Sequence, residues 1–347
     1  CFNDEIKFWE PEKEEIGHEK KVKRKEVPDF SEINGQQFVK RACEIAVSGR
    51  HNLLMIGPPG AGKTMIARRI PGILPEMTEE EALGVTKIYS VRGLLTESEA
   101  WMAERPFRNP HHTITPQGLA GGGMVPGPGE ISLAHHGVLF LDELAEFRRE
   151  TLEILRQPME EHCVKLARLA GNYEFPSDFM LVAAMNPCRC GYYPDLNRCH
   201  CTKGMVEQYL KKISQPLLDR IDICVETKRV EYQDLIKENP HQETSAEIRK
   251  RVVAATERQQ QRFVGTNIRY NSRIPAALLT KYCRLSTKQK QYMESIYQKL
   301  ELTARSYHRI LRVARTIADM DGSDEILTRH LSEAVCYRNV DKKFWEG

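Results

Sequence analysis

Residues 57–64 read Gly57-Pro58-Pro59-Gly60-Ala61-Gly62-Lys63-Thr64 and fit the phosphate-binding pattern G-x-x-x-x-G-K-S/T. Glycines in this pattern let backbone N–H groups turn inward and hold phosphate oxygens at the start of a helix. The apolar run at 52–56 predicts a buried strand before the loop, and residues 65–70 can form the helix after it. We therefore expect Lys63 to reach the β- and γ-phosphates of a nucleotide and the Thr64 hydroxyl to help bind Mg²⁺. The alternative, a Gly-Pro turn before a helix cap, is disfavoured by this order of strand, loop and helix.

The composition is that of a globular protein. The chain has 347 residues, of which 41% are hydrophobic and 29% charged, and this length favours two domains. A formal net charge of +3 gives no general positive coat, so we expect any nucleic-acid contact at particular loops or helices. No apolar run approaches the ~20 residues of a membrane helix, and no signal-peptide pattern opens the chain. These features predict a cytoplasmic protein that does not enter a membrane.

The first residues predict a linker. The chain starts at Cys1 and not at Met, so we expect that an upstream part is missing. Residues 10–26 consist mainly of Glu and Lys, which predicts a solvated connector. We divide the chain into a linker at 1–27, an α/β nucleotide-binding domain at 28–231 and a helical domain at 232–347.

Two further apolar runs end in polar side chains. The run 137–141 is followed by Asp142 and Glu143, which predicts carboxylates at the carboxyl end of a buried strand, where open α/β sheets bind their ligands. We expect Asp142 to bind Mg²⁺ directly or through water, and Glu143 to take a proton from the attacking water. The alternative is an exposed strand end with solvated acids, which the phosphate loop disfavours. A similar run at 179–185 ends at Asn186, which is placed to orient the water or contact the γ-phosphate.

The region between these motifs is irregular. Proline and glycine are so frequent at 105–136 that a continuous helix is excluded, and we expect a functional or mobile loop. Two His-His doublets, at 111–112 and 135–136, favour polar loop packing over metal binding, since no acid or thiol stands at matching spacing. Residues 164–173 predict a hairpin with a break at Gly171-Asn172, and its tip could face a pore.

Four cysteines gather after Asn186. Cys188 and Cys190 form one C-x-C pair, and Cys199 and Cys201 form another. Four thiolates at this spacing could close a tetrahedral Zn²⁺ site, although the spacing is tighter than the common C-x-x-C. Cysteines of an intracellular chain favour metal or buried thiols over disulfides. Buried or reactive thiols are therefore the first alternative and an iron–sulfur cluster the second. His200 could replace one sulfur.

The last third is helical. Arg220 precedes the strand-like run 223–226 and is flanked by acids that could orient it, although alone it predicts only a surface ion pair. Helical patterns follow at 246–263, 275–283, 287–300, 303–320 and 328–337. In the fourth of these helices Arg305, Arg309 and Arg312 share one face, which can turn toward the nucleotide.

These motifs occur in the order found in AAA+ ATPases. The segments 128–143, 186–191, 216–222 and 306–318 resemble the Mg-chelatase-like AAA+ proteins of the YifB/ComM type, and the resemblance extends from residue 29 to about residue 337. It implies an α/β fold, with an AAA+ P-loop NTPase core of parallel sheet flanked by helices and a C-terminal all-helical lid domain. It also implies an insert in the second helix, a hairpin before the Asn186 strand, and a homo-oligomer in the form of a hexameric ring.

The resemblance also implies roles for single residues. It implies that Asn186 is sensor 1, Arg220 the arginine finger and Arg305 sensor 2. The family usually carries an N-terminal Lon-protease-like domain, and we expect this domain to be missing from the given sequence. Arg189 stands where many relatives have proline.

Three functions are compatible with these motifs. The first hypothesis is an ATP-driven motor on single-stranded or branched DNA, as the ComM branch implies through its association with branch migration in natural transformation. On this hypothesis the insert, with Arg105 and Arg108, and the hairpin, with Lys165 and Arg168, grip the DNA backbone. The second is an ATPase that remodels a protein partner, as chelatase or chaperone-like relatives do. The third is a nucleotide-dependent scaffold with little turnover.

Overall fold

The structure, a computed structural model, describes residues 27–95, 101–168, 171–229 and 242–345. Residues 1–26 of the linker expected at 1–27, and the expected domain boundary near residue 231, lie outside the described residues. The division into domains therefore stays a prediction.

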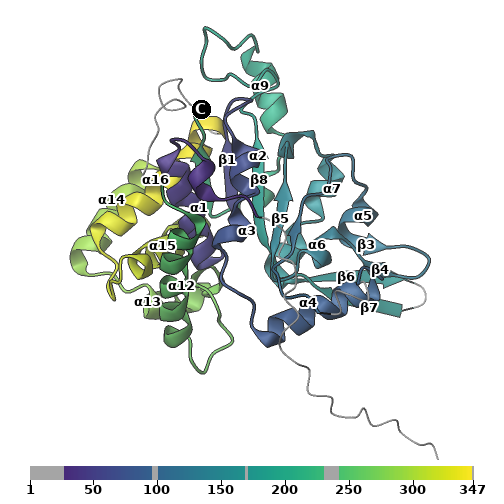
Figure 1. Cartoon of the computed structure of the whole chain (residues 1–347). Coiled ribbons are helices and arrows are strands. Elements are labelled where there is room, and N and C mark those ends of the chain that lie inside the picture. The colour runs from purple at the N-terminus through teal and green to yellow at the C-terminus, as the bar shows by residue number, and fades with distance from the viewer. Residues whose placement is uncertain (1–26, 96–100, 169–170, 230–241, 346–347) are drawn as a thin grey trace, which may run out of the picture.

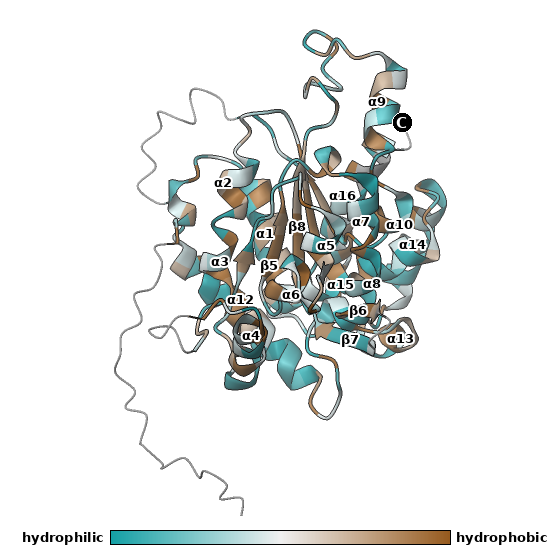
Figure 2. Cartoon of the chain, turned by 90° about the vertical axis from the view of Figure 1, so that its right-hand side faces the viewer, coloured by the Kyte–Doolittle hydropathy of each residue, from teal (hydrophilic) through white to brown (hydrophobic). Residues whose placement is uncertain are grey.

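The centre of the molecule is a five-stranded sheet in the order β2-β5-β8-β1-β9, and all its neighbouring strands are parallel. In chain order its strands are β1 (Leu53–Ile56), β2 (Phe107–Arg108), β5 (Val138–Leu141), β8 (Met180–Met185) and β9 (Ile223–Glu226). Every residue of β1, β5 and β8 is buried, as expected when helices cover both faces of a parallel sheet. Figure 2 shows these hydrophobic strands enclosed by helices that carry hydrophilic residues outward. The predicted parallel α/β core is confirmed.

Alternate residues of each strand enter two hydrophobic cores, because successive side chains of a strand point to opposite faces. Leu53 and Met55 belong to the first core, whereas Leu54 and Ile56 belong to the second. The first core is formed with α1 (Gln37–Gly49), α2 (Lys63–Ala67), α3 (Ile70–Ile73) and the C-terminal helices. The second is formed with the short helices α5 (Pro116–Ala120), α6 (Glu130–Leu133), α7 (Arg149–Glu153), α8 (Arg156–Glu161), α9 (Lys203–Leu210) and α10 (Gln215–Leu218).

The irregular segment and the hairpin lie together beyond the β5 side of the sheet, away from the C-terminal helices (Figure 1). The segment contains only short elements, as its prolines and glycines predict. It follows α4 (Glu79–Val91), and besides β2, α5 and α6 it holds the small pair β3 (Gly121–Gly122) and β4 (Gly127–Pro128). The predicted hairpin is formed by β6 (Cys163–Arg168) and β7 (Gly171–Pro176). Its break is not at Gly171-Asn172 as predicted, because these residues begin β7 and pair with Arg168 and Ala167, and the turn before them falls outside the described residues.

The C-terminal helices occupy the predicted segments. They are α12 (Ser245–Arg262), α13 (Leu279–Tyr282), α14 (Thr287–Lys299), α15 (Ala304–Met320) and α16 (Thr328–Trp345). Short 3₁₀ turns complete the fold at η1 (Phe30–Glu32), η2 (Leu144–Glu146), η3 (Asn271–Arg273) and η4 (Ala276–Leu278). The prediction for α16 ended too early, at Tyr337. The helix continues because Phe344 packs into the second core and the Trp345 indole donates to the carbonyl of Leu210. Among the described helices, none is both long and apolar enough to cross a membrane.

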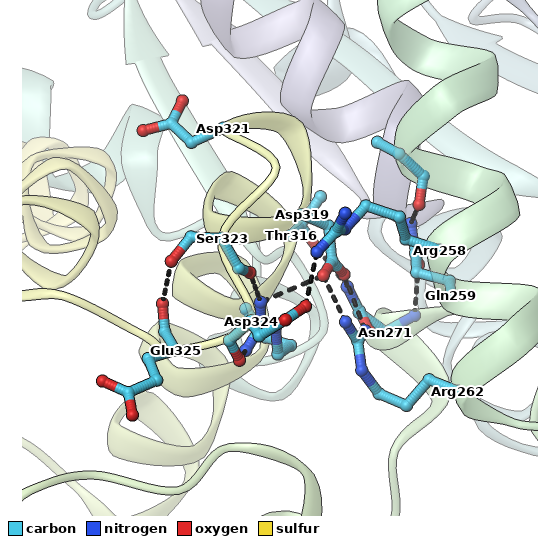
Figure 3. A network of polar contacts seen from close by, with 12 residues as sticks. Arg258, Gln259, Arg262, Asn271, Thr316, Asp319, Asp321, Ser323, Asp324 and Glu325 are labelled. Carbon is cyan, nitrogen blue, oxygen red and sulfur yellow. Dashed lines mark hydrogen bonds and ion pairs between the residues drawn. The ribbon is translucent and has the colours of Figure 1, made fainter.

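A buried polar network ties the C-terminal helices to one another (Figure 3). The Asp319 side chain on α15 is fully buried and forms ion pairs with Arg262 of α12 and Arg315 of α15. It also accepts a hydrogen bond of 2.8 Å from the Asn271 side chain. The Asn271 amide donates in addition to Thr316, whose hydroxyl lies 2.8 Å from the ring of His51. The network therefore connects three helical segments to the end of α1.

We expect Asp319→Ala to lower the free energy of unfolding by about 3–5 kcal/mol, because it leaves the buried Arg315 and the half-buried Arg262 without their carboxylate. Chemical denaturation followed by circular dichroism measures this change. Asp324→Ala is the matched control, since Asp324 is 94% exposed and its pair with Arg258 is worth at most about 1 kcal/mol. Equal stability of the two variants would contradict a stabilising role for the network.

Candidate functional site

The phosphate-binding loop connects β1 to α2. Gly62 precedes the helix with φ 80°, a left-handed conformation that favours glycine. The side chain of Lys63 is buried and turns back onto the loop. Its ammonium donates to the carbonyls of Gly57 at 2.7 Å and Pro58 at 2.9 Å, and to the Asn186 side-chain oxygen at 3.1 Å. The loop and the end of β8 are thus joined through one lysine.

The two acids follow β5 at the same edge of the sheet. Asp142 accepts a hydrogen bond of 2.6 Å from the Thr64 hydroxyl, and the backbone N–H of Glu143 donates to its other oxygen at 3.0 Å. The Glu143 side chain is 59% exposed, so water reaches its carboxylate. The structure therefore brings Lys63, Thr64, Asp142 and Asn186 together at the carboxyl ends of β1, β5 and β8, with Glu143 beside them. Their roles in catalysis stay predictions.

The charges at this edge fit a nucleotide with Mg²⁺. Burial lowers the pKa of Lys63 to about 8, against the carboxylates of Asp142 and Glu143, which act to raise it. An anion beside the lysine favours its charged form. The Thr64 hydroxyl and the Asp142 carboxylate are oxygen ligands of the type that Mg²⁺ prefers. The residues present are thus a suitable donor set for phosphates and this metal.

His112 also lies at this edge of the sheet, although from the sequence we expected it only to pack within a polar loop. The His112 Nδ1 lies 3.3 Å from a carboxylate oxygen of Glu143, and the ring of His111 contacts that of His112 in a tilted arrangement. The contact arises because β2 pairs with β5, which carries the loop after β2 to the same edge as Glu143. A two-residue strand has no periodicity from which this pairing could be predicted.

The other His-His doublet packs as predicted. The rings of His135 and His136 are tilted by 41° with their centroids 3.8 Å apart, and His135 accepts a hydrogen bond from the backbone of Asp178. Burial lowers the pKa of His135 to about 3 and that of His136 to about 4. Both rings are therefore neutral at physiological pH, in keeping with polar packing.

Arg220 and Arg305 lie at the opposite edge of the sheet from Lys63. They line one cavity of about 1010 Å³. The same cavity is lined by residues that precede strands, among them Asn52 before β1 and Asp222 before β9. The amino ends of the strands therefore form its floor, whereas the phosphate-binding loop follows their carboxyl ends.

The arginine face of α15 does not turn toward the phosphate-binding loop of its own chain, and its contact with a nucleotide stays a prediction. Arg309 is buried and donates to the carbonyls of Leu218 and Ile221, and Arg312 donates to that of Ile274. These backbone groups belong to segments at the amino edge of the sheet, so α15 directs its arginines there. Arg305, by contrast, is 65% exposed and keeps its guanidinium accessible.

The acid that orients Arg220 comes from a different element than the sequence suggested. Its guanidinium pairs with Glu160 of α8 at 2.5 Å and donates to the carbonyl of Pro216. The flanking acids have other partners, since Asp219 pairs with Arg305 and Arg309, and Asp222 with His51. Arg220, the proposed arginine finger, and Arg305, the proposed sensor 2, are thus each paired with a carboxylate at the amino edge of the sheet.

The prediction that Arg105 grips DNA was wrong. Its side chain is buried, pairs with the buried Glu81 at 2.7 Å and donates to the carbonyl of His136. Arg108 forms two hydrogen bonds of 2.7 Å with Glu130. The sequence shows that Arg105 and Arg108 are positively charged, but it does not show which acidic side chains pair with them.

On the hairpin, Lys165 is accessible. Its side chain is 53% exposed and pairs with Glu161 at 2.7 Å. The side chain of Arg168 lies outside the described part of the molecule, so its expected role stays a prediction.

The four cysteines converge. The sulfur atoms of Cys188, Cys190, Cys199 and Cys201 all lie within 4.8 Å of one another, and the four thiols are free. His200 is exposed and does not belong to this group. The donor set is therefore four sulfurs, without the histidine replacement considered from the sequence.

Known proteins share these features. The chain matches the family described as magnesium chelatase, subunit ChlI, over residues 29–235, and the C-terminal region of that subunit over residues 242–338. It is 44% identical over 314 residues to the uncharacterized protein YifB of Escherichia coli, covering 90% of this chain and 61% of YifB. It is 43% identical over 310 residues to the competence protein ComM of Haemophilus influenzae, covering 89% of this chain and 60% of ComM.

A more distant relative is the magnesium-chelatase 67 kDa subunit of Chlorobaculum parvum, with 27% identity over 162 residues, 46% of this chain and 23% of that subunit. The chain thus spans about three fifths of the length of the YifB and ComM relatives that it matches. The two family matches cover both the sheet with its phosphate-binding loop and the C-terminal helices. The chain therefore belongs to the Mg-chelatase-like family of AAA+ ATPases, in the group that includes YifB and ComM.

Proposed function

We propose that this chain hydrolyses ATP with Mg²⁺ at a site completed by a second copy of the chain. The observation that carries the proposal is the position of Arg220 and Arg305. Both line a cavity at the amino edge of the sheet, whereas Lys63 and Asp142 lie at the carboxyl edge. One chain cannot bring the two sets together, but a head-to-tail contact between copies can. Repeated head-to-tail contacts close into a ring, and we propose a hexamer.

Each residue then has one task. Thr64 and Asp142 would hold Mg²⁺, which supplies positive charge at the phosphates when bound. Lys63 adds a second positive charge, and Glu143 takes the proton of the attacking water, which Asn186 orients. Arg220 and Arg305 from the neighbouring copy would neutralise the charge that develops on the transferred phosphoryl group. His112 holds the Glu143 carboxylate from its other side.

For the work done with ATP, we propose movement on single-stranded or branched DNA. The similarity to a competence protein supports this proposal. The accessible Lys165 supports it too, because its surface pair with Glu161 is weak enough to exchange for a phosphate.

The second candidate is remodelling of a protein partner. Met124 and Val125, at the tip of the β3–β4 pair, are 105% and 87% exposed, and an exposed apolar tip suits a protein substrate better than a phosphate backbone. The similarity to a magnesium-chelatase subunit also favours it.

ATPase assays with and without single-stranded and branched DNA distinguish the two candidates. They require a formed ring and the full-length protein, in which any upstream region is present. We expect DNA to bind at low salt and to raise the hydrolysis rate. A formed, ATP-bound ring that binds no DNA at low salt would favour the protein-remodelling function instead.

We expect the double variant Lys165→Ala/Arg168→Ala to weaken DNA binding and to make its salt dependence shallower. Each lost phosphate contact releases one counterion fewer, so the log–log slope should fall by about one per residue. Lys211→Ala is the control, since Lys211 is equally a surface lysine of an i,i+4 pair but lies on α9. Unchanged affinity and slope, with ATPase activity retained, would show that the hairpin does not grip DNA.

A further inference from the structure

The sulfur atoms of the cysteine cluster have the spacing of a single tetrahedral metal site. The Sγ of Cys188 lies 3.3 Å from that of Cys190 and 3.8 Å from that of Cys199, and the latter two are 3.6 Å apart. Tetrahedral Zn²⁺ with Zn–S bonds of about 2.3 Å separates neighbouring sulfurs by about 3.8 Å. The fourth sulfur, of Cys201, lies within 4.8 Å of the other three.

Other cysteine chemistry fits less well. A disulfide requires sulfurs about 2.05 Å apart, and these thiols are free. A multinuclear iron–sulfur cluster places several iron and sulfide atoms between the cysteines, which requires wider separations. Apolar burial explains only part of the convergence, because Cys188 and Cys199 belong to the second core, whereas Cys190 and Cys201 are only partly buried and residues 194–198 between the two pairs are exposed. The exposed part of the loop therefore has little packing that would fix the partly buried Cys190 and Cys201 beside the other two sulfurs.

The backbone around the cluster supports thiolate ligands. The N–H groups of Gly191 and Tyr193 donate to the Cys188 sulfur at 3.3 and 3.4 Å. Such donors orient a metal-binding thiolate and stabilise its charge. The ring of Tyr193 also packs near that of Phe344, which anchors the loop to α16.

The loop that carries the cysteine cluster packs against the phosphate-binding loop. Cys188 follows Asn186, whose side chain accepts a hydrogen bond from Lys63, by two positions. Gly191 is buried with φ 87°, and a Cβ at this residue would lie 2.5 Å from the Cδ of Pro59. Only glycine allows so close an approach, so the cysteine loop and the phosphate-binding loop pack backbone against ring.

We propose that Cys188, Cys190, Cys199 and Cys201 bind one Zn²⁺, and that this ion holds the loop 187–202 against the phosphate-binding loop, so that loss of the metal weakens nucleotide binding. The metal site stands independently of the proposed ATPase function, whereas its effect on nucleotide binding rests on that function.

Elemental analysis of protein purified without added metal or chelator tests the site. We expect about one zinc per chain, and we expect Co²⁺ exchanged into the site to give the absorption bands of a tetrahedral thiolate complex. Cys199→Ser should reduce the zinc content severalfold. Cys336→Ser is the matched control, since Cys336 is an exposed cysteine outside the cluster, and its zinc content should not change. Wild-type protein with little zinc, or with iron in its place, would overturn the metal site.

Zinc removal tests the effect on the nucleotide. The wild-type chain is stripped by a chelator with a thiol reagent, dialysed into a reducing buffer and supplied again with Mg²⁺, and its ATP affinity is measured before and after Zn²⁺ is restored. We expect ATP affinity to fall at least tenfold when zinc is removed and to recover when zinc is restored. Circular dichroism should show that the helices of the protein persist throughout.

Gly191→Ala separates the two parts of the proposal. It keeps all four thiols, so the zinc content should stay near one per chain, but its methyl group displaces Pro59 and should weaken ATP binding. The protein could hold one zinc per chain and yet keep its ATP affinity both after zinc removal and in Gly191→Ala. That result would overturn the role of zinc in nucleotide binding and leave the metal site standing. A zinc-loaded wild-type chain that binds no nucleotide would overturn both the proposed ATPase function and the role of zinc in nucleotide binding, and would still support the metal site.

Discussion

Arg220→Ala is expected to slow ATP hydrolysis by about 10³–10⁵-fold and to leave ATP affinity nearly unchanged. An arginine supplied by a neighbouring subunit stabilises charge that exists only in the transition state of phosphoryl transfer, so its loss affects turnover and not binding. The structure supports action on a neighbour, because Arg220 lines the cavity at the amino edge of the sheet. Its pair with Glu160 must open or shift before the guanidinium can reach another chain.

The measurement is steady-state ATPase activity, with nucleotide affinity determined separately by equilibrium binding. Arg258→Ala serves as the control, since Arg258 pairs with the exposed Asp324 and neither residue lines this cavity. Action between subunits is tested by mixing Arg220→Ala chains with Glu143→Gln chains. A mixed ring contains some sites with an intact Glu143 and an intact neighbouring Arg220, so part of the activity should return. Absence of rescue in rings shown to be mixed would contradict action in trans.

The sequence predicted best those features whose pattern of apolar and polar residues lies within one short segment. The strand β9 was predicted at its observed bounds, because a short apolar run ends at Glu226 on one side and at Asp222 on the other. The sheet edge with Lys63, Asp142 and Asn186 was predicted for a related reason. Parallel strands direct their carboxyl ends to one edge, so three separate apolar runs with polar ends converge without any knowledge of their order.

The features that were missed depend on partners distant in sequence. Glu160 and Arg220 are sixty positions apart, and nothing in either segment indicates that they pair. Arg105 is unsuitable for DNA because its side chain is buried against Glu81, on α4, and donates to the carbonyl of His136. His112 reaches Glu143 through the pairing of β2 with β5, and β2 is too short to show a pattern. Side-chain partners across elements are set by tertiary packing, which a local pattern does not contain.

Lys63→Ala and Glu143→Gln are expected to cause two different defects at one site. Lys63 is buried, and its ammonium bridges the loop carbonyls and Asn186, so its removal takes away both the charge that attracts phosphates and the contact between loop and strand. ATP binding should be abolished. Glu143 is exposed, and the hydrogen bonds of the Lys63 ammonium go to Gly57, Pro58 and Asn186 instead, so Glu143→Gln should bind ATP normally.

Hydrolysis by Glu143→Gln should fall by about 10²–10⁴-fold, because a glutamine amide cannot accept the proton of the attacking water. The substitution keeps the size of the side chain and an oxygen that can still accept from His112, so the fold and the nucleotide site should be preserved. Glu146→Gln is the matched control, since Glu146 is also an exposed glutamate, placed on η2 and paired with Lys212. Equilibrium binding of a labelled nucleotide and steady-state release of phosphate, measured on the same preparations, separate the two defects. Undiminished phosphate release by Glu143→Gln would show that another group serves as the base, and tight ATP binding by Lys63→Ala would show that the loop backbone alone holds the phosphates.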